Sequence, residues 1–594
     1  MRAPALIGLL ALSPLLAESA NRQEPSGVDA ILSIPRGSPV TPSVAPSTPG
    51  LAPLAPTLGS TGNAGYMIGT PSTPEPPVES RPAQMVIDCA GKQTRISPLI
   101  YGIAYSPRAD QTGSYLEELG ATARRWGGNP SSRYNWKLGN AWNTGSDWYF
   151  RNVDYSGDPR FSHQRFLDEN LAHRLRSALT VPLLGWVAKD TKSYSFPVSV
   201  YGAQKSADPA NSDAGDGMGR DGKRLAPGDP TRTSQASTPA MIGEWVAAME
   251  RGREPRSSPS IYILDNEPML WHVTHRDVHP QPVGYDELLE RTLAYGTAVR
   301  RAAPRALIAG PALWGWPAYF YSAIDAEAGF RLHPDRRRHG NVPLLPWYLA
   351  RLREHEQRTG NRLLDLVDVH FYPQGEDLKE NSERTCAHRI RSTRGLWDPT
   401  YVDESWIGEP IELIPRLRRW IEQSYPGLGI SLGEYNFGAE QLTCGGVALA
   451  EALGRFGQQG LTAAFYWTAP PERSPAYWAF RAYRNFDGQG GHFLEWSVSA
   501  QAPAGTSLFA SRSEAGDHLV AVALNLQPAK VAQASIELRS CGRLTGGKVY
   551  AFQGRSPPAA ETIDARGSAA GLRRDLAAYS ITVFDLRVAK ERNP

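Results

Sequence analysis

Short apolar runs alternate with longer stretches of mixed composition between residues 98 and 490. Continuous apolar character is typical of strands that are buried on both faces, as in a parallel sheet. Eight such runs occur, at residues 99–106, 121–126, 181–187, 260–265, 306–310, 366–372, 429–434 and 461–467. Eight strands separated by segments long enough for helices predict an α/β fold, a (β/α)8 barrel of the TIM type with long insertions.

Two of the intervening segments carry clear helix signals. Thr238 is a good N-cap, Pro239 suits the first helical position, and apolar residues then recur three or four positions apart as far as Met249. A second helix is expected to begin near Tyr285. The apolar positions predicted to share its buried face are Leu289, Leu293 and Val299.

Helical spacing ends near residue 497, and β-rich runs follow at 518–526, 531–538, 548–552 and 579–586. These runs predict a smaller antiparallel β-sandwich. Two short extended runs, 85–88 and 94–96, precede the first barrel strand and are expected to join that sandwich. The predicted domains are therefore a barrel over 98–490 and a β-sandwich formed by 84–97 together with 491–594.

The first 83 residues differ from the rest of the chain. Residues 1–20 combine Arg2 with an apolar stretch and small residues before a cleavage site, as in a secretory signal peptide. The stretch is shorter than the roughly 20 apolar residues of a membrane span. Residues 21–83 are rich in Pro, Ser and Thr and predict a disordered linker. We therefore expect a secreted protein, extracellular or periplasmic, with no membrane-spanning segment.

Charge excludes some partners. Lys and Arg total 63 against 60 Asp and Glu, a formal net charge of +3, which provides no field to recruit nucleic acid or an anionic membrane. The 16 Trp and 24 Tyr residues offer flat rings on which sugars can stack. We expect a polysaccharide partner, no nucleic-acid or membrane partner, and a monomer.

Four cysteines permit two disulfides in an oxidising compartment, with three possible full pairings. Their spacing does not resemble a metal site. Placement in the predicted domains favours Cys89 with Cys541 and Cys386 with Cys444.

Glutamates stand at the ends of the fourth and seventh predicted strands. Glu267 follows the run 260–265, and Glu434 ends the run 429–434. Reactive side chains of such barrels stand at the carboxyl ends of strands, where strands four and seven can face each other across the mouth. Glycosidic cleavage requires one protonated carboxyl group that protonates the leaving oxygen and one ionised carboxylate. The pair therefore predicts a glycoside hydrolase.

Several neighbours could adjust this pair. Asn266 could donate a hydrogen bond to a substrate hydroxyl, and Trp467 could stack under the sugar that is cleaved. Tyr372, by a hydrogen bond, and Arg125, by its charge, could keep Glu434 ionised. Alternatively, Glu434 is a buried ion-pair partner of Arg125 with no catalytic role.

Five segments resemble glycoside hydrolase family 44, whose members are endo-acting glucanases and xyloglucanases. They are Arg-Trp-Gly-Gly-Asn at 125–129, Asp-Asn-Glu-Pro at 265–268, Asp-Val-His-Phe-Tyr-Pro-Gln at 368–374, Trp-Asp-Pro-Thr-Tyr at 397–401 and Gly-Glu-Tyr-Asn at 433–436. The resemblance implies a barrel with a β-sandwich and a retaining endo-β-1,4-glucanase that requires no cofactor. It also implies Glu267 as acid/base and Glu434 as nucleophile. Cellulose-like chains, xyloglucan or mixed-linkage β-glucan would be its substrates.

Further polar and aromatic side chains are candidates for contacts with the polysaccharide. The substrate-binding candidates are Arg125, Trp126, Asn129, Trp136, Asn266, Trp271, His370, Tyr372, Trp397 and Trp467. Additional candidate sugar platforms, any of which could instead belong to the core, are Trp148, Trp314, Trp316 and Tyr319.

Metal sites are weaker hypotheses. His272, His275 and His279 follow the fourth strand, but the charged residues between the last two favour hydrogen bonding over metal binding. We therefore predict no catalytic metal. A loop with Asn211, Asp213 and Asp216 could hold a structural calcium ion through oxygen ligands, although a solvated turn is the simpler interpretation.

Two other functions fit part of the pattern. The same carboxylate pair would serve another barrel glycanase, a xylanase or a mannanase. A non-catalytic polysaccharide-binding protein built on an inactive barrel is disfavoured because both carboxylates are present.

Overall fold

The computed structural model describes residues 82–105, 113–155, 162–251, 258–375, 377–529, 531–563 and 572–589. The predicted signal peptide 1–20 and all of the predicted linker except residues 82 and 83 lie outside this range. Within it, no helix is both long and apolar enough to cross a membrane. The first strand, β1, spans Ala83–Asp88.

Eight parallel strands close into a barrel, which confirms the predicted fold class. In chain order they are β3 (Gly102–Ala104), β4 (Ala123–Trp126), β7 (Arg176–Val181), β12 (Ile261–Leu264), β13 (Leu307–Leu313), β14 (Leu366–Phe371), β15 (Gly429–Tyr435) and β16 (Ala463–Tyr466). Small and branched residues such as Ala178, Ile263 and Leu366 pack together inside the barrel. Such packing leaves polar side chains for the carboxyl ends of the strands.

The third barrel strand is not where the apolar run at 181–187 predicts it. Strand β7 ends at Val181, and the apolar residues that follow belong to a buried loop and to β8 (Trp186–Ala188). Strand β8 pairs antiparallel with β11 (Ser234–Ala236), outside the barrel. The true strand begins at the exposed Arg176, and this charged start hides it from a search for apolar runs.

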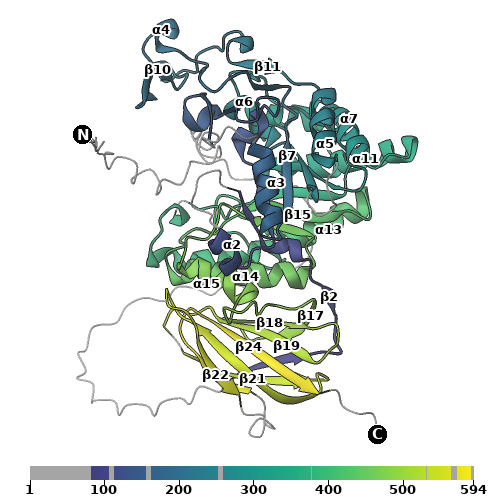
Figure 1. Ribbon diagram of the computed structural model, residues 1–594, viewed down its shortest axis with the longest axis vertical. Coiled ribbons are helices and arrows are strands. Elements are labelled where there is room, and N and C mark those ends of the chain that lie inside the picture. Colours follow the sequence, from purple (N-terminus) through teal and green to yellow (C-terminus); the bar gives the residue numbers. More distant parts are fainter. Residues whose placement is uncertain are drawn as a thin grey trace, which may run out of the picture. The chain divides into compact units, whose positions relative to one another are not determined.

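Helices surround the barrel (Figure 1). The longer ones are α3 (Ser162–Ala172), α5 (Pro239–Glu250), α7 (Tyr285–Ala302), α11 (Leu344–Thr359), α13 (Leu413–Ser424), α14 (Thr443–Gln459) and α15 (Pro475–Arg484). Helix α5 begins as predicted, with the Thr238 hydroxyl accepting a hydrogen bond from the N–H of Met241. The sequence prediction for the buried face of α7 is correct for Val299 and one position off for the other two residues. Leu288, Tyr295 and Val299 are buried, whereas Leu289 and Leu293 lie half-buried at the edge of that stripe.

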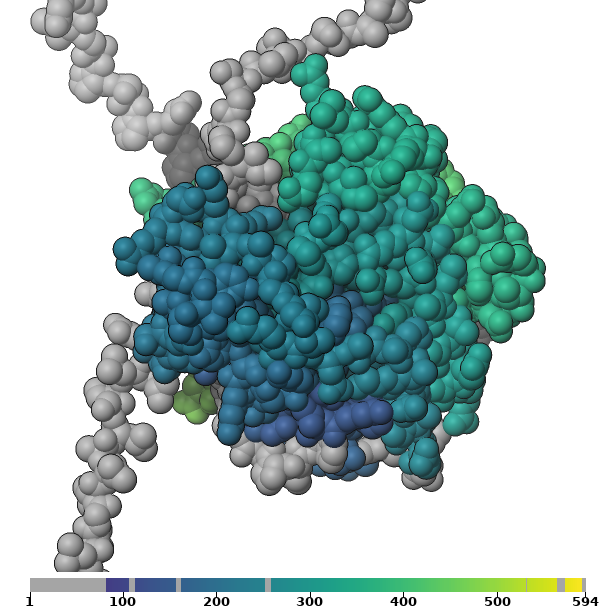
Figure 2. Space-filling model, turned by 90° about the horizontal axis from the view of Figure 1, so that it is seen from above, coloured from purple at the N-terminus to yellow at the C-terminus, as the bar shows by residue number. Residues whose placement is uncertain are grey.

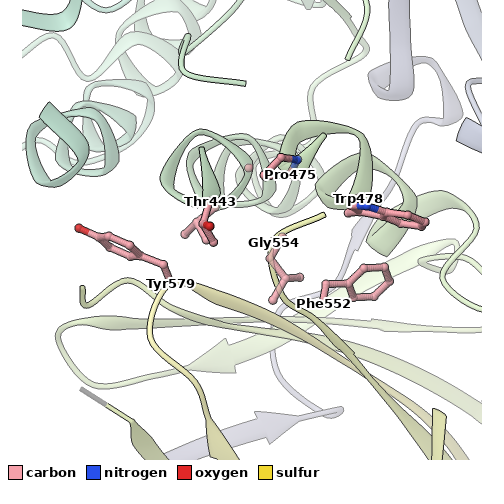
Figure 3. Close-up of a pocket in the computed structure, with 9 residues that line it drawn as sticks. Thr443, Pro475, Trp478, Phe552, Gly554 and Tyr579 are labelled. Atoms are coloured by element: carbon pink, nitrogen blue, oxygen red, sulfur yellow. The ribbon is translucent and has the colours of Figure 1, made fainter. Parts of the chain in front are cut away.

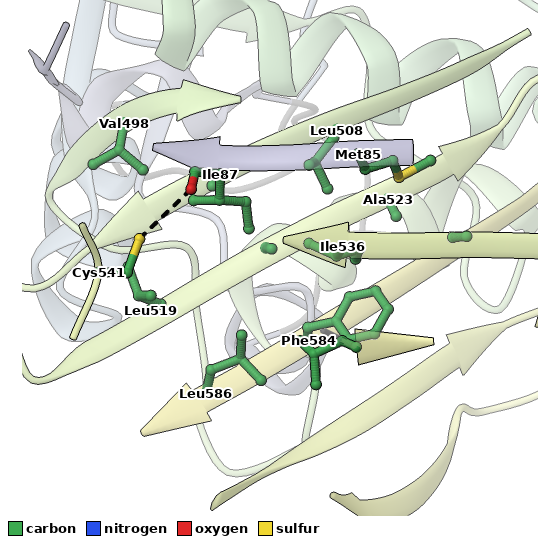
Figure 4. Packing of buried hydrophobic residues seen from close by; sticks show 14 of the residues in the cluster. Met85, Ile87, Val498, Leu508, Leu519, Ala523, Ile536, Cys541, Phe584 and Leu586 are labelled. Carbon is green, nitrogen blue, oxygen red and sulfur yellow. Dashed lines mark hydrogen bonds between the residues drawn. The ribbon is translucent and has the colours of Figure 1, made fainter. Parts of the chain in front are cut away.

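The second domain is one curled sheet in which all but one of the strand pairs are antiparallel. Its strands are β1, β2 (Thr94–Arg95), β17 (Trp496–Gln501), β18 (Thr506–Arg512), β19 (His518–Asn525), β20 (Ala532–Arg539), β21 (Arg543–Phe552), β22 (Ala559–Ile563), β23 (Leu572–Leu576) and β24 (Ser580–Ala589). Strand β1 lies between β17 and β20 and pairs parallel with β20. Met85, Ile536 and Phe584 meet inside the curl (Figure 4). Strands from both ends of the described chain therefore share one core.

Two disulfides join segments that are distant in sequence. Cys89 bonds Cys541 within the β domain, and Cys386 bonds Cys444 at the start of α14. Both are the pairings that the placement of the cysteines favours.

A crevice with an empty volume of about 210 Å³ lies where α14 and α15 meet the β domain. Trp478, Phe552 and Tyr579 are among the residues that line it (Figure 3). None of the predicted site residues contributes to this crevice, which is formed by helix sides and sheet rather than by the ends of the barrel strands.

Candidate active site

Glu267 and Glu434 meet at the carboxyl ends of β12 and β15. The nearest carboxylate oxygens of the two side chains and Nδ1 of His370 all lie within 4.8 Å of one another. Glu267 is 8 % exposed and Glu434 is 5 % exposed. Both carboxyl groups are therefore largely shielded from water. Charge interactions are stronger in such a shielded site than in bulk water.

Two donors hold Glu434. Nη1 of Arg125 donates to Oε1 of Glu434 at 2.6 Å, and the Tyr372 hydroxyl donates to Oε2 at 2.7 Å. Burial opposes ionisation, but the charges of His370 and Arg125 and these hydrogen bonds outweigh it, so the pKa of Glu434 lies below its ordinary value. Arg125 itself is buried and acts on Glu434 rather than on substrate.

Glu267 is shifted in the opposite direction. Burial raises the pKa of Glu267, and the negative charge of Glu434 adds to this, against a hydrogen bond from His370. A carboxyl group with a raised pKa beside one with a lowered pKa is the arrangement that separates an acid from a base.

Asp265 fixes the turn that carries Glu267. Its buried carboxylate accepts hydrogen bonds from the backbone N–H groups of Leu183, of Leu184 at 3.1 Å and of Asn266 at 2.7 Å. Asp265 and Glu267 have backbone φ angles of 64° and 47°, in the left-handed region that residues other than glycine rarely adopt. Such strain persists where surrounding contacts hold it. Sequence reasoning missed this aspartate, whose only signal is its position two residues before Glu267.

His370 lies between the two glutamates. Its Nδ1 is 2.8 Å from Oε1 of Glu267 and 3.6 Å from Oε2 of Glu434. Burial lowers the pKa of His370, but the charge of Glu434 and the bond to Glu267 prevail and raise it. The expectation that His370 binds substrate is wrong, because its side chain is fully buried and its Nδ1 contacts the carboxylates.

A chain of hydrogen bonds connects Arg125 to the rim. Nη2 of Arg125 donates to Oδ1 of Asn266 at 2.8 Å, and Nδ2 of Asn266 donates to Oδ1 of Asn129 at 3.0 Å. Asn129 in turn donates to Asp147 at 2.9 Å, next to Trp148. Asn266 is buried in this chain, so its amide orients neighbouring residues, whereas Asn129 is half-buried at the rim.

Two predicted sugar-contacting aromatics are buried and not available to substrate. Trp126 is buried in a cluster with Tyr105 and Trp142. Trp271 is buried, and its Nε1 donates to Asp265. These two predictions are wrong because the apolar rings pack into the barrel wall instead of the mouth.

Two other aromatic candidates lie beside helices. Trp397 is half-buried, and the guanidinium of Arg455 on α14, which also contacts Phe509 of the β domain, lies over its ring. Trp136 is half-buried and donates from Nε1 to the carbonyl of Met241, at the start of α5. Among the additional platforms, Trp314, Trp316 and Tyr319 are buried.

Three tryptophans do reach the surface of the mouth. Trp467 is partly exposed at the end of β16, with the Arg125 guanidinium 5.8 Å from its ring. Trp148 is 48 % exposed and donates from Nε1 to Asp208 at 3.2 Å. Trp406 is 52 % exposed and donates from Nε1 to Gln374, just beyond β14. Sequence reasoning did not select Trp406 as a platform, although its polar surroundings at 403–405 are a signal of exposure.

The end of the barrel domain that carries the segment after β7 is seen from above in Figure 2. Blue and teal segments cover this face, and β10 (Asn211–Gly215) belongs to the blue part of the chain. Insertions between the strands and helices thus build up the rim around the strand ends.

Metal binding has one geometric candidate among the described residues. Glu267, His370 and Glu434 are the only described group of three such side chains with converging ligand atoms. The Arg125 cation at 2.6 Å from Glu434 opposes a second positive charge at this point. This arrangement is a poor fit to a metal and a good fit to paired carboxylates.

The other two metal hypotheses gain no support from side-chain geometry. His272 and His279 contact Glu327 and Glu287 instead of converging with His275. In the segment predicted as a loop, which the structure folds as strand β10 followed by Asp216, Asp213 accepts hydrogen bonds from Tyr194 and from the N–H of Ser199, and Asp216 accepts one from the N–H of Met218. These bonds use the carboxylate oxygens that a calcium ion requires.

Comparisons with known proteins agree with this geometry. The model of glycoside hydrolase family 44 matches residues 141–375. Endoglucanase A of Paenibacillus lautus is 30 % identical over 494 residues, which cover 78 % of this chain and 67 % of that protein. Beta-mannanase/endoglucanase A of Caldicellulosiruptor saccharolyticus is 29 % identical over 516 residues, 80 % of this chain, but this chain spans only about a third, 36 %, of its length.

Solved structures share the fold along most of the chain. A bifunctional glucanase-xylanase protein from a metagenome library is 34 % identical with a TM-score of 0.81, covering 86 % of this chain and 99 % of that one. A family 44 xyloglucanase from Paenibacillus polymyxa, solved with xyloglucan, is 27 % identical with a TM-score of 0.71, covering 85 % and 100 %. Barrel, paired glutamates and sequence similarity define a glycoside hydrolase. The chain belongs to glycoside hydrolase family 44.

Proposed function

We propose that this glycoside hydrolase is a retaining endo-β-1,4-glucanase that acts on cellulose-like chains, xyloglucan or mixed-linkage β-glucan. The observation that carries the proposal is the pairing of Glu267 and Glu434, whose nearest oxygens lie within 4.8 Å and whose pKa values are shifted in opposite directions. Retaining enzymes hold their carboxyl groups about 5 to 5.5 Å apart, whereas inverting enzymes need about 6.5 to 9.5 Å to admit a water. The short separation supports retention.

The first step forms a bond between Glu434 and the anomeric carbon. As the carboxylate attacks, the bond from that carbon to the leaving oxygen breaks, and Glu267 transfers its proton to this oxygen. A glycosyl ester on Glu434 and an ionised Glu267 result.

The second step reverses these roles. Glu267 takes a proton from a water molecule, whose oxygen attacks the anomeric carbon while the ester bond to Glu434 breaks. Glu434 leaves as a carboxylate and Glu267 is again protonated. Two inversions at one carbon give net retention.

His370 suits this exchange of charge. Before the first step the negative charge is on Glu434, and after it the charge is on Glu267. Nδ1 of His370 is 2.8 Å from one carboxylate and 3.6 Å from the other, so the same donor faces whichever group is ionised. Preorganised donors of this kind lower the cost of charge movement.

The exposed tryptophans support a polymeric substrate. Trp148 follows β4 and Trp406 follows β14, so they lie on loops of different strands around the mouth. Sugar rings stack on such flat apolar faces, and platforms on several rim loops suit a chain that extends beyond the cleaved linkage.

A substrate panel tests this proposal. Reducing ends released from xyloglucan, carboxymethyl cellulose, mixed-linkage glucan, xylan and mannan should be most abundant with one of the glucans. A xylanase or a mannanase is the second candidate. One relative is named as a glucanase-xylanase and another as a beta-mannanase/endoglucanase. Greater release from xylan or mannan would select this candidate, and tight binding without release would favour a non-catalytic protein.

We also propose that the protein is exported and monomeric. The signal-like composition of residues 1–20 supports export. N-terminal sequencing of protein recovered from the medium or periplasm should show cleavage after the apolar stretch, and size-exclusion chromatography with light scattering should give the mass of one chain. Recovery with an intact N-terminus from the cytoplasm would contradict export.

A further inference from the structure

A group of buried polar atoms lies inside the barrel beneath the two glutamates. Side chains alternate along a strand, so Leu366, Asp368 and His370 of β14 point to the same side, and Leu366 belongs to the interior cluster. Asp368 is fully buried, and its carboxylate oxygens make no hydrogen bond of normal distance and angle to a described residue, but the Ser431 hydroxyl lies close enough to lower the pKa of Asp368. Nε2 of His370 is also buried without a partner among the described residues, and the buried Oγ of Ser431 lies close to Asp368 across the two strands.

Asp368 sits directly beside the strand that carries Glu434. Its register partner on β15 is Ser431. A Cβ atom on Gly433 would lie only 2.5 Å from Oδ2 of Asp368, so only glycine at this position leaves room for the carboxylate. The carboxylate therefore lies against the backbone one residue before Glu434.

The charged and titratable groups around Asp368 come from four elements. They are His370 on β14, Arg125 on β4, Glu434 on β15 and Tyr319 on α8 (Trp316–Phe320). Burial raises the pKa of Asp368, while the charges of His370 and Arg125 and the hydroxyl of Ser431 act in the opposite direction. An ionised Asp368 therefore depends on a cationic His370, and the reverse holds by linkage.

Buried polar groups are nearly always hydrogen-bonded, and enclosed water bridges those that protein groups do not reach. A carboxylate, a hydroxyl and an imidazole nitrogen within two residues of one another on the paired strands β14 and β15 provide the several polar partners that such a water needs. Nδ1 of His370 is already committed to Glu267, so Nε2 is the atom left to face this group.

We propose that Asp368 is a positioning residue that accepts the Nε2–H of His370 through enclosed water and so keeps His370 in its cationic form. This inference deepens the proposed function and rests on it for its consequence in catalysis. Asp368 has no access to substrate. It acts through His370, whose Nδ1–H then stays directed at the carboxylates through both steps.

NMR of protein labelled with ¹⁵N-histidine tests the proposal without any need for activity. In the wild type at neutral pH both ring nitrogens of His370, assigned with a His370→Gln variant, should be protonated. In Asp368→Asn, which keeps the shape but not the charge, the pH at which His370 loses its proton should fall by about one unit or more. A neutral His370 ring in the wild type, or an unchanged titration in Asp368→Asn, overturns the proposal.

Kinetics provide the second readout. Asp368→Asn should lower kcat about tenfold or more with KM nearly unchanged, because a buried residue that tunes proton transfer does not contact substrate. Glu451→Gln is the matched control, since Glu451 is a buried carboxylate paired with Arg455 on α14, away from the barrel mouth. A rise in KM with constant kcat would contradict the assignment.

Failure of the proposed function remains distinguishable from failure of this inference. If the wild type cleaves no glycan, the function is wrong while the NMR titration still tests the link between Asp368 and His370. If Asp368→Asn does not fold, as judged by thermal unfolding, the protonation state of His370 in the wild type decides alone.

Discussion

Nη1 of Arg125 lies 2.6 Å from Oε1 of Glu434, and both side chains are buried. The ion pair connects the second barrel strand, β4, with the seventh, β15. It supplies the positive charge that a buried carboxylate needs if it is to remain ionised for attack on an anomeric carbon. The ion-pair and nucleophile interpretations of Glu434 are therefore compatible.

Replacement of Arg125 by Gln should raise the pKa of Glu434 and destabilise the fold. Breaking a buried pair costs about 3 to 5 kcal/mol because the remaining charge is uncompensated. The acid limb of the kcat/KM profile should move to higher pH. Since the folded pKa of Glu434 is depressed, its contribution to the free energy of unfolding is present at neutral pH and lost as pH falls through that pKa. Denaturant unfolding should thus show the largest deficit of the variant near neutral pH, and a deficit that grows toward acid would contradict it.

Replacement of Tyr372 by Phe should act in the same direction more weakly. The hydroxyl is 2.7 Å from Oε2 of Glu434, and a hydrogen bond to a charged group contributes about 1.5 to 3 kcal/mol. The acid limb should again shift upward, with the fold intact. Tyr348→Phe is a suitable control, because its buried hydroxyl contacts Thr292 on a helix away from the mouth. Equal pH profiles for wild type and Tyr372→Phe would rule out this role.

Replacement of Glu267 by Ala should depend on the leaving group. General acid catalysis contributes about 10² to 10⁴ in rate, so hydrolysis of glucans should fall by this amount. Formation of the glycosyl-enzyme from an aryl glycoside whose leaving group needs no proton should be largely retained, visible as a burst of released phenol. Equal loss on both substrates would exclude Glu267 as the acid.

Removal of Trp148 and Trp406 should weaken the binding of long chains. Aromatic platforms act on the polymer beyond the cleaved linkage, so Trp148→Ala combined with Trp406→Ala should raise KM for the polysaccharide with a smaller effect on short aryl glycosides. Leu332→Ala is a control for loss of an exposed apolar side chain, since Leu332 is 59 % exposed outside the proposed site. An unchanged KM for the polymer would exclude these rings as platforms.

The bond between Cys89 and Cys541 should stabilise the β domain. It links residues 452 positions apart, and loss of a native disulfide typically costs about 2 to 5 kcal/mol. Cys89→Ser with Cys541→Ser should lower the temperature of thermal unfolding, and reductant should have little further effect on the β-domain transition. If the variant and the wild type unfold at the same temperature, the bond contributes nothing to stability.

The sequence predicts most barrel strands because their apolar runs record burial on both faces. It misplaces the third strand because β7 starts at the charged Arg176, and the apolar residues after Val181 serve a buried loop. The glutamate pair is predictable since both residues stand at strand ends. The position of His370 between them is not, because that contact joins residues 103 positions apart in the chain.

The aromatic candidates show the same limit. Trp126, Trp271 and Trp467 are identical in chemistry, yet the first two pack into the barrel wall and only the last reaches the mouth. Which face of a strand or turn a ring occupies depends on register and on neighbours from other strands. Composition and local spacing do not contain that information.

Proton NMR of the first product of glucan hydrolysis tests the pairing of Glu267 and Glu434 most directly. Double displacement on Glu434 predicts that the β-anomer of the new reducing end appears first and that the α-anomer grows in later by mutarotation. Initial appearance of the α-anomer would mean a single displacement by water, which two carboxylates with oxygens within 4.8 Å leave no room for, and would contradict the assigned roles.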